Sequence, residues 1–292
     1  MLFSAALLVA GGSISPLNPA TLSEMNMDHV SEGEPHCGVA IEKAGGLLTL
    51  TFDRPEKKNA ITGAMYQAMA DALASAETDP TVRAILFCGS DKIFSAGNDL
   101  EDFMKRPPSG PDAPVFQFLQ RISGASKPLI AAVAGPAVGI GTTLLLHCDM
   151  VYAADNARFS LPFAPLGLCP EAASSLLLPR IAGYQRAAEK LLTGDAFDAH
   201  EALAMGIVNK MLPTAELPAY AVAQARKLIA LPPASLRVTK ALMKGGATGA
   251  AEVAAVMNTE VAHFSQMLRA PEARESMTAF FEKRKPDFSK FD

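Results

Sequence analysis

The sequence has no excess of positive charge, no paired cysteine motif and none of the common phosphate or metal motifs. Its 26 Lys and Arg against 30 Asp and Glu give a formal net charge of −4. This balance argues against nucleic acid or an anionic membrane as the main partner, because both bind basic patches. The four cysteines are scattered without CxxC spacing. We therefore expect reduced core residues of an intracellular protein, and neither a disulfide framework nor a zinc site.

Four motifs with known chemistry are missing. The sequence contains no GxxxxGK[ST], no GxGxxG that opens a helix, no GxSxG and no HExxH,. The five histidines do not cluster at metal-ligand spacing, and His147 lies in an apolar stretch where a satisfied core histidine is the commoner interpretation. We expect no metal ion and no separate cofactor.

The first 36 residues differ from the rest. The run Leu2–Ala10 is apolar, but no Lys or Arg precedes it and it is short for a membrane span, which takes about 20 residues,. We expect residues 1–36 to be a disordered tail, or a stretch ahead of a true start at Met25 or Met27. The final letters SKFD are not a peroxisomal address, so we expect a cytoplasmic protein.

From Gly38 the sequence alternates between strand and helix patterns. Residues 46–55, 82–90 and 128–135 predict strands, and residues 62–80 predict a helix with Thr62 as its cap,. Residues 141–161 predict a helix, a strand and a turn, and residues 184–213 predict two short helices and a strand. Everything after Pro218 predicts helices. The pattern indicates an α/β fold with buried parallel strands, in which 37–217 form the core and 218–292 a C-terminal helical subdomain.

Two glycine-containing turns each follow a buried strand. One is FSAGNDLEDF, residues 94–103, and the other is AGPAVGIGTTLLL, residues 134–146. Glycine at a strand end lets backbone amides point into a cleft, and the second turn also opens a helix, whose first amides are unpaired. Two such amides that converge would form an oxyanion hole. On spacing alone, ordinary tight turns are the commoner interpretation.

Glu171 is the only charged residue between Arg158 and Arg180. Burial disfavours the charged form of a carboxyl group and raises its pKa. A glutamate after proline also suits the first turn of a helix. Both interpretations are compatible, since a carboxylate in a first turn can face a cleft.

These blocks together resemble the crotonase superfamily of enoyl-CoA hydratases and isomerases. The likeness is carried by IFSAGNDL and by AAVAGPAVGIGTTLLLHCDMVYAADNARFSLPFAPLGLCPE, with LTLTFDRPEKKNAIT before them and FFEKRKPDF after them, from about Val39 to Phe288. The resemblance implies a crotonase (ClpP-like) spiral of ββα units with a C-terminal helical subdomain that mediates trimer formation. It also implies acyl-CoA substrates, with coenzyme A as part of the substrate, and a homotrimer or a hexamer that is a dimer of trimers.

The resemblance assigns roles to single residues. The backbone amides that hold the thioester oxygen fall on Asn98 and on Ile140. The two glutamates of the family's hydratases fall on Thr143 and Phe163, so both carboxylates are missing and water addition lacks its base and its acid,. PFAPLGLCPE resembles the branch of peroxisomal-type Δ3,Δ2-enoyl-CoA isomerases, in which a glutamate at this place is the single acid–base residue. The resemblance therefore implies catalysis by Glu171.

Other positions are expected to contact the substrate. Lys58 and Lys283 match segments that meet the phosphates of coenzyme A, and Asp99 and Leu100 match the segment that wraps its adenine. The expected acyl tunnel and the remaining contact positions comprise Ala60, Ala96, Gly139, Gly141, Thr143, Leu144, Phe163, Leu166 and Leu168.

Three alternatives stay open at this point. One is another reaction of the superfamily, such as thioester hydrolysis, decarboxylation or residual hydration. The second is a dienoyl-CoA isomerase, which calls on further carboxylates. The third is a non-catalytic acyl-CoA-binding or protein-binding member, because a fold alone does not settle function. Chain-length preference and pathway do not follow from the sequence.

Overall fold

A six-stranded sheet organises the fold, seen in a computed structural model that describes residues 37–106, 108, 110 and 112–291. The tail expected over 1–36 lies outside the described residues. Along the sheet the order is β1-β2-β3-β4-β6-β9, with β1 antiparallel to β2 and the other neighbours parallel. The strands are β1 Val39–Ala44, β2 Leu47–Phe52, β3 Ala84–Cys88, β4 Leu129–Val133, β6 Met150–Ala154 and β9 Lys210–Leu212. The apolar runs predicted as buried strands are β3 and β4, in the middle of the sheet.

Three short strands form a second sheet, and two of them follow directly after strands of the main sheet. The second sheet has the order β5-β7-β8, with β5 Pro136–Val138, β7 Arg158–Ser160 and β8 Phe197–Asp198. β5 follows β4 after two residues and β7 follows β6 after three, so two successive central strands each turn into a strand of the second sheet. This repeat of paired strands followed by helix agrees with the expected α/β architecture.

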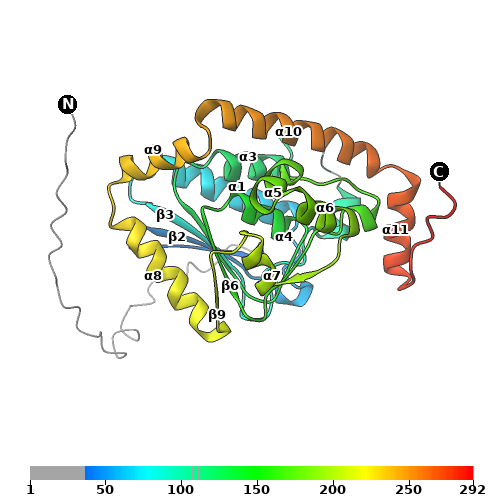
Figure 1. Ribbon diagram of the computed structural model, residues 1–292, viewed down its shortest axis with the longest axis horizontal. Coiled ribbons are helices and arrows are strands. Elements are labelled where there is room, and N and C mark those ends of the chain that lie inside the picture. Colours follow the sequence, from blue (N-terminus) through cyan, green and yellow to red (C-terminus); the bar gives the residue numbers. More distant parts are fainter. Residues whose placement is uncertain (1–36, 107, 109, 111, 292) are drawn as a thin grey trace. The chain divides into compact units, whose positions relative to one another are not determined.

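The two faces of the main sheet bury different side chains, because successive residues of a strand point to opposite faces. On one face Ile85 and Phe87 join the larger core with helices α1 and α3. On the other face Ala84 and Leu86 pack with α8. Figure 1 shows α8 on the side of the sheet opposite to α1 and α3.

Helix α1 begins where its capping residue predicts. Helix α1 starts after Thr62, whose hydroxyl accepts a hydrogen bond from the Met65 amide at 3.3 Å. Such a cap contributes about 1 kcal/mol. The helices are α1 Gly63–Thr78, α2 Leu100–Lys105, α3 Pro114–Gly124, α4 Ile140–Thr143, α5 Ser174–Ala182, α6 Tyr184–Thr193, α7 Ala199–Ala204, α8 Leu217–Ile229, α9 Pro233–Met243, α10 Gly246–Met267 and α11 Pro271–Phe281.

The region after Pro218 is helical, as the sequence predicts, and it consists of α8 to α11. Helix α8 packs on the main sheet through Ala221 and Ala225. Helix α10 lies beside α3 and α5 in Figure 1, so residues far apart in the chain meet at the loop that precedes α5. The boundary at 217/218 stays a prediction. In the part of the chain that the structure describes, no helix is both long and apolar enough to cross a membrane.

Candidate active site

The two glycine-containing turns lie against each other. Ser95 forms an isolated parallel bridge with Ala137, and Asn98 forms one with Ile61. A Cβ atom built on Gly97, whose φ is +86°, would lie only 2.8 Å from the carbonyl oxygen of Val138. Only glycine therefore permits the first turn to approach the second this closely.

The backbone amides of Asn98 and Ile140 are left without hydrogen-bond acceptors. The Ile61 amide donates to the Gly97 oxygen at 2.8 Å and the Asp99 amide donates to the Ile61 oxygen at 2.9 Å, so the Asn98 amide points away from this bridge. Ile140 is the first residue of α4, where amides have no intrahelical acceptor,. Within the described residues, no hydrogen bond engages either amide. Both amides are therefore unpaired in the part of the chain that the structure describes.

Tyr66 on α1 lies beside the first turn, and no sequence motif singles it out. Its hydroxyl donates to Oδ1 of Asn98, and its ring contacts that of Phe118 at a centroid distance of 5.5 Å. Burial and, in second place, the charge of Glu171 raise the pKa of Tyr66 well above its ordinary value. The Asn98 side chain is therefore held by a neutral hydroxyl, and the charge of Glu171 also acts on the pKa of that hydroxyl.

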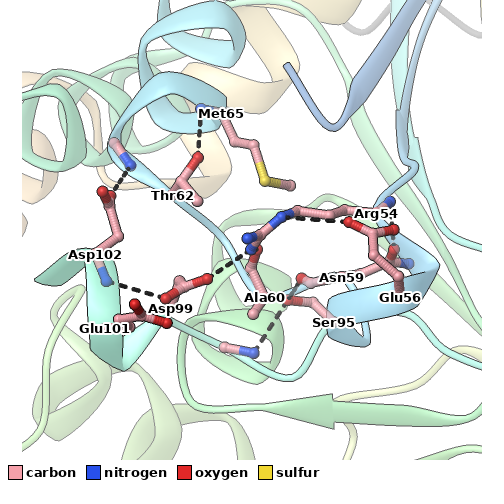
Figure 2. Close-up of polar contacts among 12 residues, drawn as sticks. Arg54, Glu56, Asn59, Ala60, Thr62, Met65, Ser95, Asp99, Glu101 and Asp102 are labelled. Carbon is pink, nitrogen blue, oxygen red and sulfur yellow. Dashed lines mark hydrogen bonds and ion pairs between the residues drawn. The ribbon is translucent and has the colours of Figure 1, made fainter. Parts of the chain in front are cut away.

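A polar network fixes the first turn to the chain before α1 (Figure 2). Arg54 forms an ion pair with Asp99 at 2.6 Å and donates to the Ala60 oxygen at 3.0 Å. Asp99 also caps α2, and Asp102 accepts a hydrogen bond from the Gly63 amide at 2.8 Å. Because these groups are partly buried and charged, their hydrogen bonds are of the stronger kind. Arg54 is a residue that the sequence analysis missed.

Glu171 lies on the wall of an apolar cavity of about 360 Å³. Its side chain is 8% exposed, and Oε1 has no hydrogen-bond partner. Burial, reinforced by the charge of Glu260, raises the pKa of Glu171 to about 8. Among the residues that the structure describes, Glu171 is the only acidic one that lines the cavity. The lining residues are Phe103, Met104, Pro108, Val115, Phe116, Leu119, Glu171, Val261, Phe264, Ser265, Leu268, Arg269, Arg274 and Met277.

The hydroxyl of Thr143 is the other unpaired polar group. Among the described residues, Oγ1 of Thr143 and Oε1 of Glu171 are the buried side-chain oxygen or nitrogen atoms that lack a partner. Buried polar groups are normally hydrogen-bonded, so each exception needs an explanation. Both exceptions fall on residues that the sequence analysis assigned to the site, and a polar ligand would satisfy them.

Glu171 precedes helix α5 and does not lie in its first turn. Helix α5 begins at Ser174, and the two residues between, Ala172 and Ala173, have φ values of 59° and 54°. The Glu171 carbonyl accepts hydrogen bonds from the Ser174 amide at 3.0 Å and the Ser174 hydroxyl at 2.6 Å. The helix-dipole interpretation of Glu171 therefore does not describe its position, and a tight left-handed turn holds the residue instead.

His147 is the satisfied core histidine that the sequence predicts. It is buried, and its Nε2 lies 2.8 Å from the Ala172 carbonyl oxygen. Because a carbonyl only accepts, Nε2 carries the hydrogen. Burial lowers the pKa of His147 to about 4, so the ring is neutral.

The other expected contact residues differ in how deeply they are buried. Leu144, Phe163 and Leu168 are buried in the larger core and Leu166 packs against it, and none of these lines the cavity beside Glu171. Lys58 and Lys283 are exposed, each with a positive φ. Ala96, Leu100 and Gly139 are half-buried and Gly141 is buried. Their roles toward a substrate stay predictions.

Within residues 37–106 and 112–291, no group of three or more His, Cys, Asp or Glu could hold a metal ion.

Comparison with known proteins places this geometry in a family. Residues 42–290 match the family model described as enoyl-CoA hydratase/isomerase. The chain is 40% identical over 213 residues to enoyl-CoA delta isomerase 2 of Rattus norvegicus, a match that covers 71% of this chain and 54% of that protein. It is 34% identical over 253 residues to 1,2-epoxyphenylacetyl-CoA isomerase of Escherichia coli, covering 84% of this chain and 95% of that protein. The chain therefore spans little more than half of the rat protein.

A solved structure agrees with these matches. The enoyl-CoA hydratase/isomerase of Pseudoalteromonas atlantica superposes with a TM-score of 0.82 at 42% identity, over 86% of this chain and 100% of that chain. This likeness confirms the expected crotonase-type fold. Other matched proteins are named as a 2,3-dehydroadipyl-CoA hydratase and a 4-chlorobenzoyl coenzyme A dehalogenase, so the matches include several reactions.

We expect Glu171 to destabilise the protein as pH rises. Burial raises the pKa of Glu171 in the folded protein to about 8, above its ordinary value of 4.5. Between these two values the unfolded chain releases the proton while the folded chain keeps it, so the unfolding free energy falls by up to about 1.4 kcal/mol per pH unit. Urea unfolding of wild type and Glu171→Gln from pH 5 to pH 9 measures this. A stability difference that does not change with pH would contradict the raised pKa.

We expect Gly97→Ala to destabilise the protein more than Gly45→Ala. Both glycines have positive φ, +86° and +56°, but nothing lies within 4 Å of a Cβ on Gly45. The control carries only the backbone strain, about 1–2 kcal/mol, whereas Gly97→Ala adds overpacking of about 1–3 kcal/mol. Urea unfolding at one pH gives both values. Equal losses would show that the two turns can separate without resistance.

Proposed function

The chain belongs to the enoyl-CoA hydratase/isomerase family, and from this premise we propose that it is a Δ3,Δ2-enoyl-CoA isomerase. It would move the double bond of a 3-enoyl-CoA to the 2-trans position. The observation that carries the proposal is the single acidic residue on the cavity wall, whose Oε1 is buried and unpartnered. The match to the rat isomerase supports the same reaction.

One carboxyl group suffices for this isomerisation. The protons at C2 of a 3-enoyl thioester are acidic because the carbonyl and the double bond both delocalise the resulting charge. The carboxylate of Glu171 takes one of these protons, and the electron pair shifts through C3 to form a dienolate. The carboxylic acid then returns a proton at C4, which leaves the double bond between C2 and C3 and regenerates the carboxylate.

The apolar surroundings of Glu171 suit this role. With a pKa of about 8, roughly a tenth of the enzyme carries the ionised form at neutral pH. That fraction is a stronger base than an exposed glutamate, because proton uptake relieves its desolvation.

The amides of Asn98 and Ile140 would stabilise the dienolate. Its negative charge gathers on the thioester oxygen, and two unpaired amides that point at this oxygen form an oxyanion hole. Each donor would contribute roughly 3 kcal/mol to the transition state. The close packing of Gly97 on Val138 supports the assignment, because it brings the two amide-bearing turns together.

The remaining contacts concern the coenzyme A part of the substrate, and we propose no separate cofactor. Lys58 and Lys283 would bind its phosphates, where an acidic chain needs local positive charge. Hydration is disfavoured, because Thr143 and Phe163 replace the carboxylates that would activate water. A dienoyl-CoA isomerase would need a second acid on the cavity wall, and the described lining has none.

We expect purified protein to convert 3-hexenoyl-CoA to the conjugated 2-enoyl thioester, followed by ultraviolet absorbance. Glu171→Gln should lower kcat by about 10²–10⁴-fold, because the sole proton carrier is removed. Glu252→Gln is the matched control, since Glu252 is a half-exposed glutamate paired with Arg180. Conversion that survives in Glu171→Gln would place the base elsewhere. No conversion by wild type, with the coenzyme A ester still bound, would favour another reaction of the family or a binding protein.

We also expect a homotrimer or a dimer of trimers. The C-terminal helices expose large apolar side chains, among them Leu242 and Met243 at the end of α9 and Phe280 and Phe281 on α11. Burial of such side chains between subunits would remove this apolar area from water. Sedimentation equilibrium should give three or six times the 30.7 kDa of one chain. A monomer at micromolar concentration would contradict this expectation.

A further inference from the structure

Glu260 connects helix α10 to the loop that carries Glu171. Glu260 is only 6% exposed, although glutamate side chains are mostly exposed in proteins,. Its carboxylate accepts three hydrogen bonds, from the Ala173 amide at 2.6 Å, the Ser175 amide at 3.0 Å and the Ser175 hydroxyl at 2.5 Å. These donors come from residues two and four positions after Glu171.

The three hydrogen bonds make Glu260 the cap of helix α5. Ala173 occupies the N-cap position and has no side-chain oxygen for that purpose. The first amides of a helix are unpaired and lie at the positive end of its dipole. A carboxylate from another helix, placed against these amides, satisfies them and is stabilised by them. The first amides of α5 are therefore capped by a side chain from α10 and not by a residue of α5 itself.

The loop between Glu171 and α5 needs such an anchor. Ala172 and Ala173 are consecutive alanines with φ of 59° and 54°, a conformation that costs about 1–2 kcal/mol for each residue,. His147 donates to the Ala172 oxygen from one side, and Glu260 binds the Ala173 amide from the other. Strained conformations persist only where the surroundings hold them. This pair of contacts holds the turn that directs Glu171.

The surroundings of the two carboxyl groups favour different protonation states. Glu260 has three donors, which favour its ionised form, whereas Oε1 of Glu171 has none. The charge of Glu260 is the second cause, after burial, that raises the pKa of Glu171. Burial raises the pKa of Glu260 too, and its hydrogen bonds to Ser175 and Ala173 counter that effect. Neighbouring carboxyl groups behave in this way when one is solvated by donors and the other is not.

We propose that Glu260 is a positioning residue, which aims the Glu171 carboxyl group into the cavity through its three hydrogen bonds to Ala173 and Ser175. The inference rests on the proposed role of Glu171 as the acid–base group. The negative charge of Glu260 behind that group also keeps it protonated in the resting enzyme and basic once ionised. Helix α10 thus has two parts in the site, since Val261 and Phe264 of the same helix line the cavity.

Other titratable groups surround Glu171 and stay unchanged in the test. Tyr66 on α1 has a pKa that burial and, second, the charge of Glu171 raise. Cys169 in the same loop has a pKa that burial and the charges of Glu260 and Glu171 raise. Arg269 and Arg274 line the cavity. Glu260 is the group whose charge acts on the pKa of Glu171. A substitution of Glu260 therefore separates its effect from theirs.

The test compares Glu260→Gln, Glu260→Asp and Glu260→Ala with Glu252→Gln, which removes a charge from an exposed position of the same helix. For wild type we expect kcat/KM for 3-hexenoyl-CoA to rise with pH and to level off above about 8, where Glu171 is ionised,. Glu260→Gln keeps an acceptor oxygen but loses the charge. Its acid limb should move to lower pH without reaching 4.5, because burial remains.

Glu260→Ala loses the anchor, and its plateau kcat should fall on the order of 10²-fold, the effect of a small misplacement of a catalytic group. Glu260→Asp retains the charge, so its acid limb should stay near that of wild type. Glu252→Gln should change neither quantity. An unmoved acid limb in Glu260→Gln, or a folded Glu260→Ala with kcat within threefold of wild type, overturns the proposal.

A second readout does not depend on the reaction. Protein labelled with ¹³C at the glutamate carboxyl carbons gives the titration of Glu171 in the free enzyme, assigned by the signal that Glu171→Gln lacks. Its midpoint should fall in Glu260→Gln and stay in Glu252→Gln. If wild type does not isomerise 3-hexenoyl-CoA but this midpoint still falls, the proposed function fails and the link between Glu260 and Glu171 stands. An unchanged midpoint in Glu260→Gln overturns the link, whatever the enzyme does to its substrate.

Discussion

The burial of one carboxyl group against an apolar wall is the constraint on which the site depends. Oε1 of Glu171 has no partner in a cavity lined mainly by apolar side chains. An unpaired buried polar group costs about 1–3 kcal/mol, and the left-handed Ala172 and Ala173 add strain of similar size,. The molecule keeps this arrangement because Glu260 and His147 bind the loop from two sides. Contacts that hold the loop therefore belong to the site as much as Glu171 does.

The same physical logic explains the two glycine turns. Backbone amides in folded proteins are almost always paired, yet the structure leaves those of Asn98 and Ile140 free within the described residues. The bridge from Ile61 to the residues that flank Asn98 turns that amide outward. The start of α4 does so for Ile140. Unpaired donors and an unpaired acceptor thus occur in one molecule, which is the pattern expected where a ligand completes the hydrogen bonding.

Local pattern predicted most of the fold. The apolar runs predicted β3 and β4, and the helical spacing after Thr62 predicted α1. Glu171, which stands among apolar residues in the sequence, is buried in the structure. The first-turn interpretation of Glu171 was wrong, because no residue pattern shows that two alanines adopt positive φ. Glu260 and Tyr66 were missed for another reason. Their partners lie 87 and 32 positions away, and only the packing of α10 on α5 and of α1 on the first turn brings them together.

The predicted acyl-contact residues stay predictions, and the structure shows where their side chains lie. Leu144 and Phe163 are apolar and near the turns in sequence, but their side chains fill the core. The wall beside Glu171 includes side chains from α2, α3, α10 and α11, which are far apart in the sequence. Apolar type alone does not distinguish a core residue from a cavity residue, since both are excluded from water.

The number of carboxylates in such a cavity decides which reaction it can support. Water addition needs one group to activate water and another to protonate the α-carbon, whereas allylic proton transfer returns the same proton carrier to its starting state. At the positions that the resemblance matches to the hydratase glutamates, Thr143 offers a hydroxyl, which is far too weak a base near neutral pH, and Phe163 offers no titratable group. The burial of Glu171 against this wall also raises its basicity, because desolvation raises its pKa,. Under the proposed function, Glu171 would therefore move a proton within the substrate, and the charge of Glu260 on helix α10 would make it a stronger base because that charge raises its pKa.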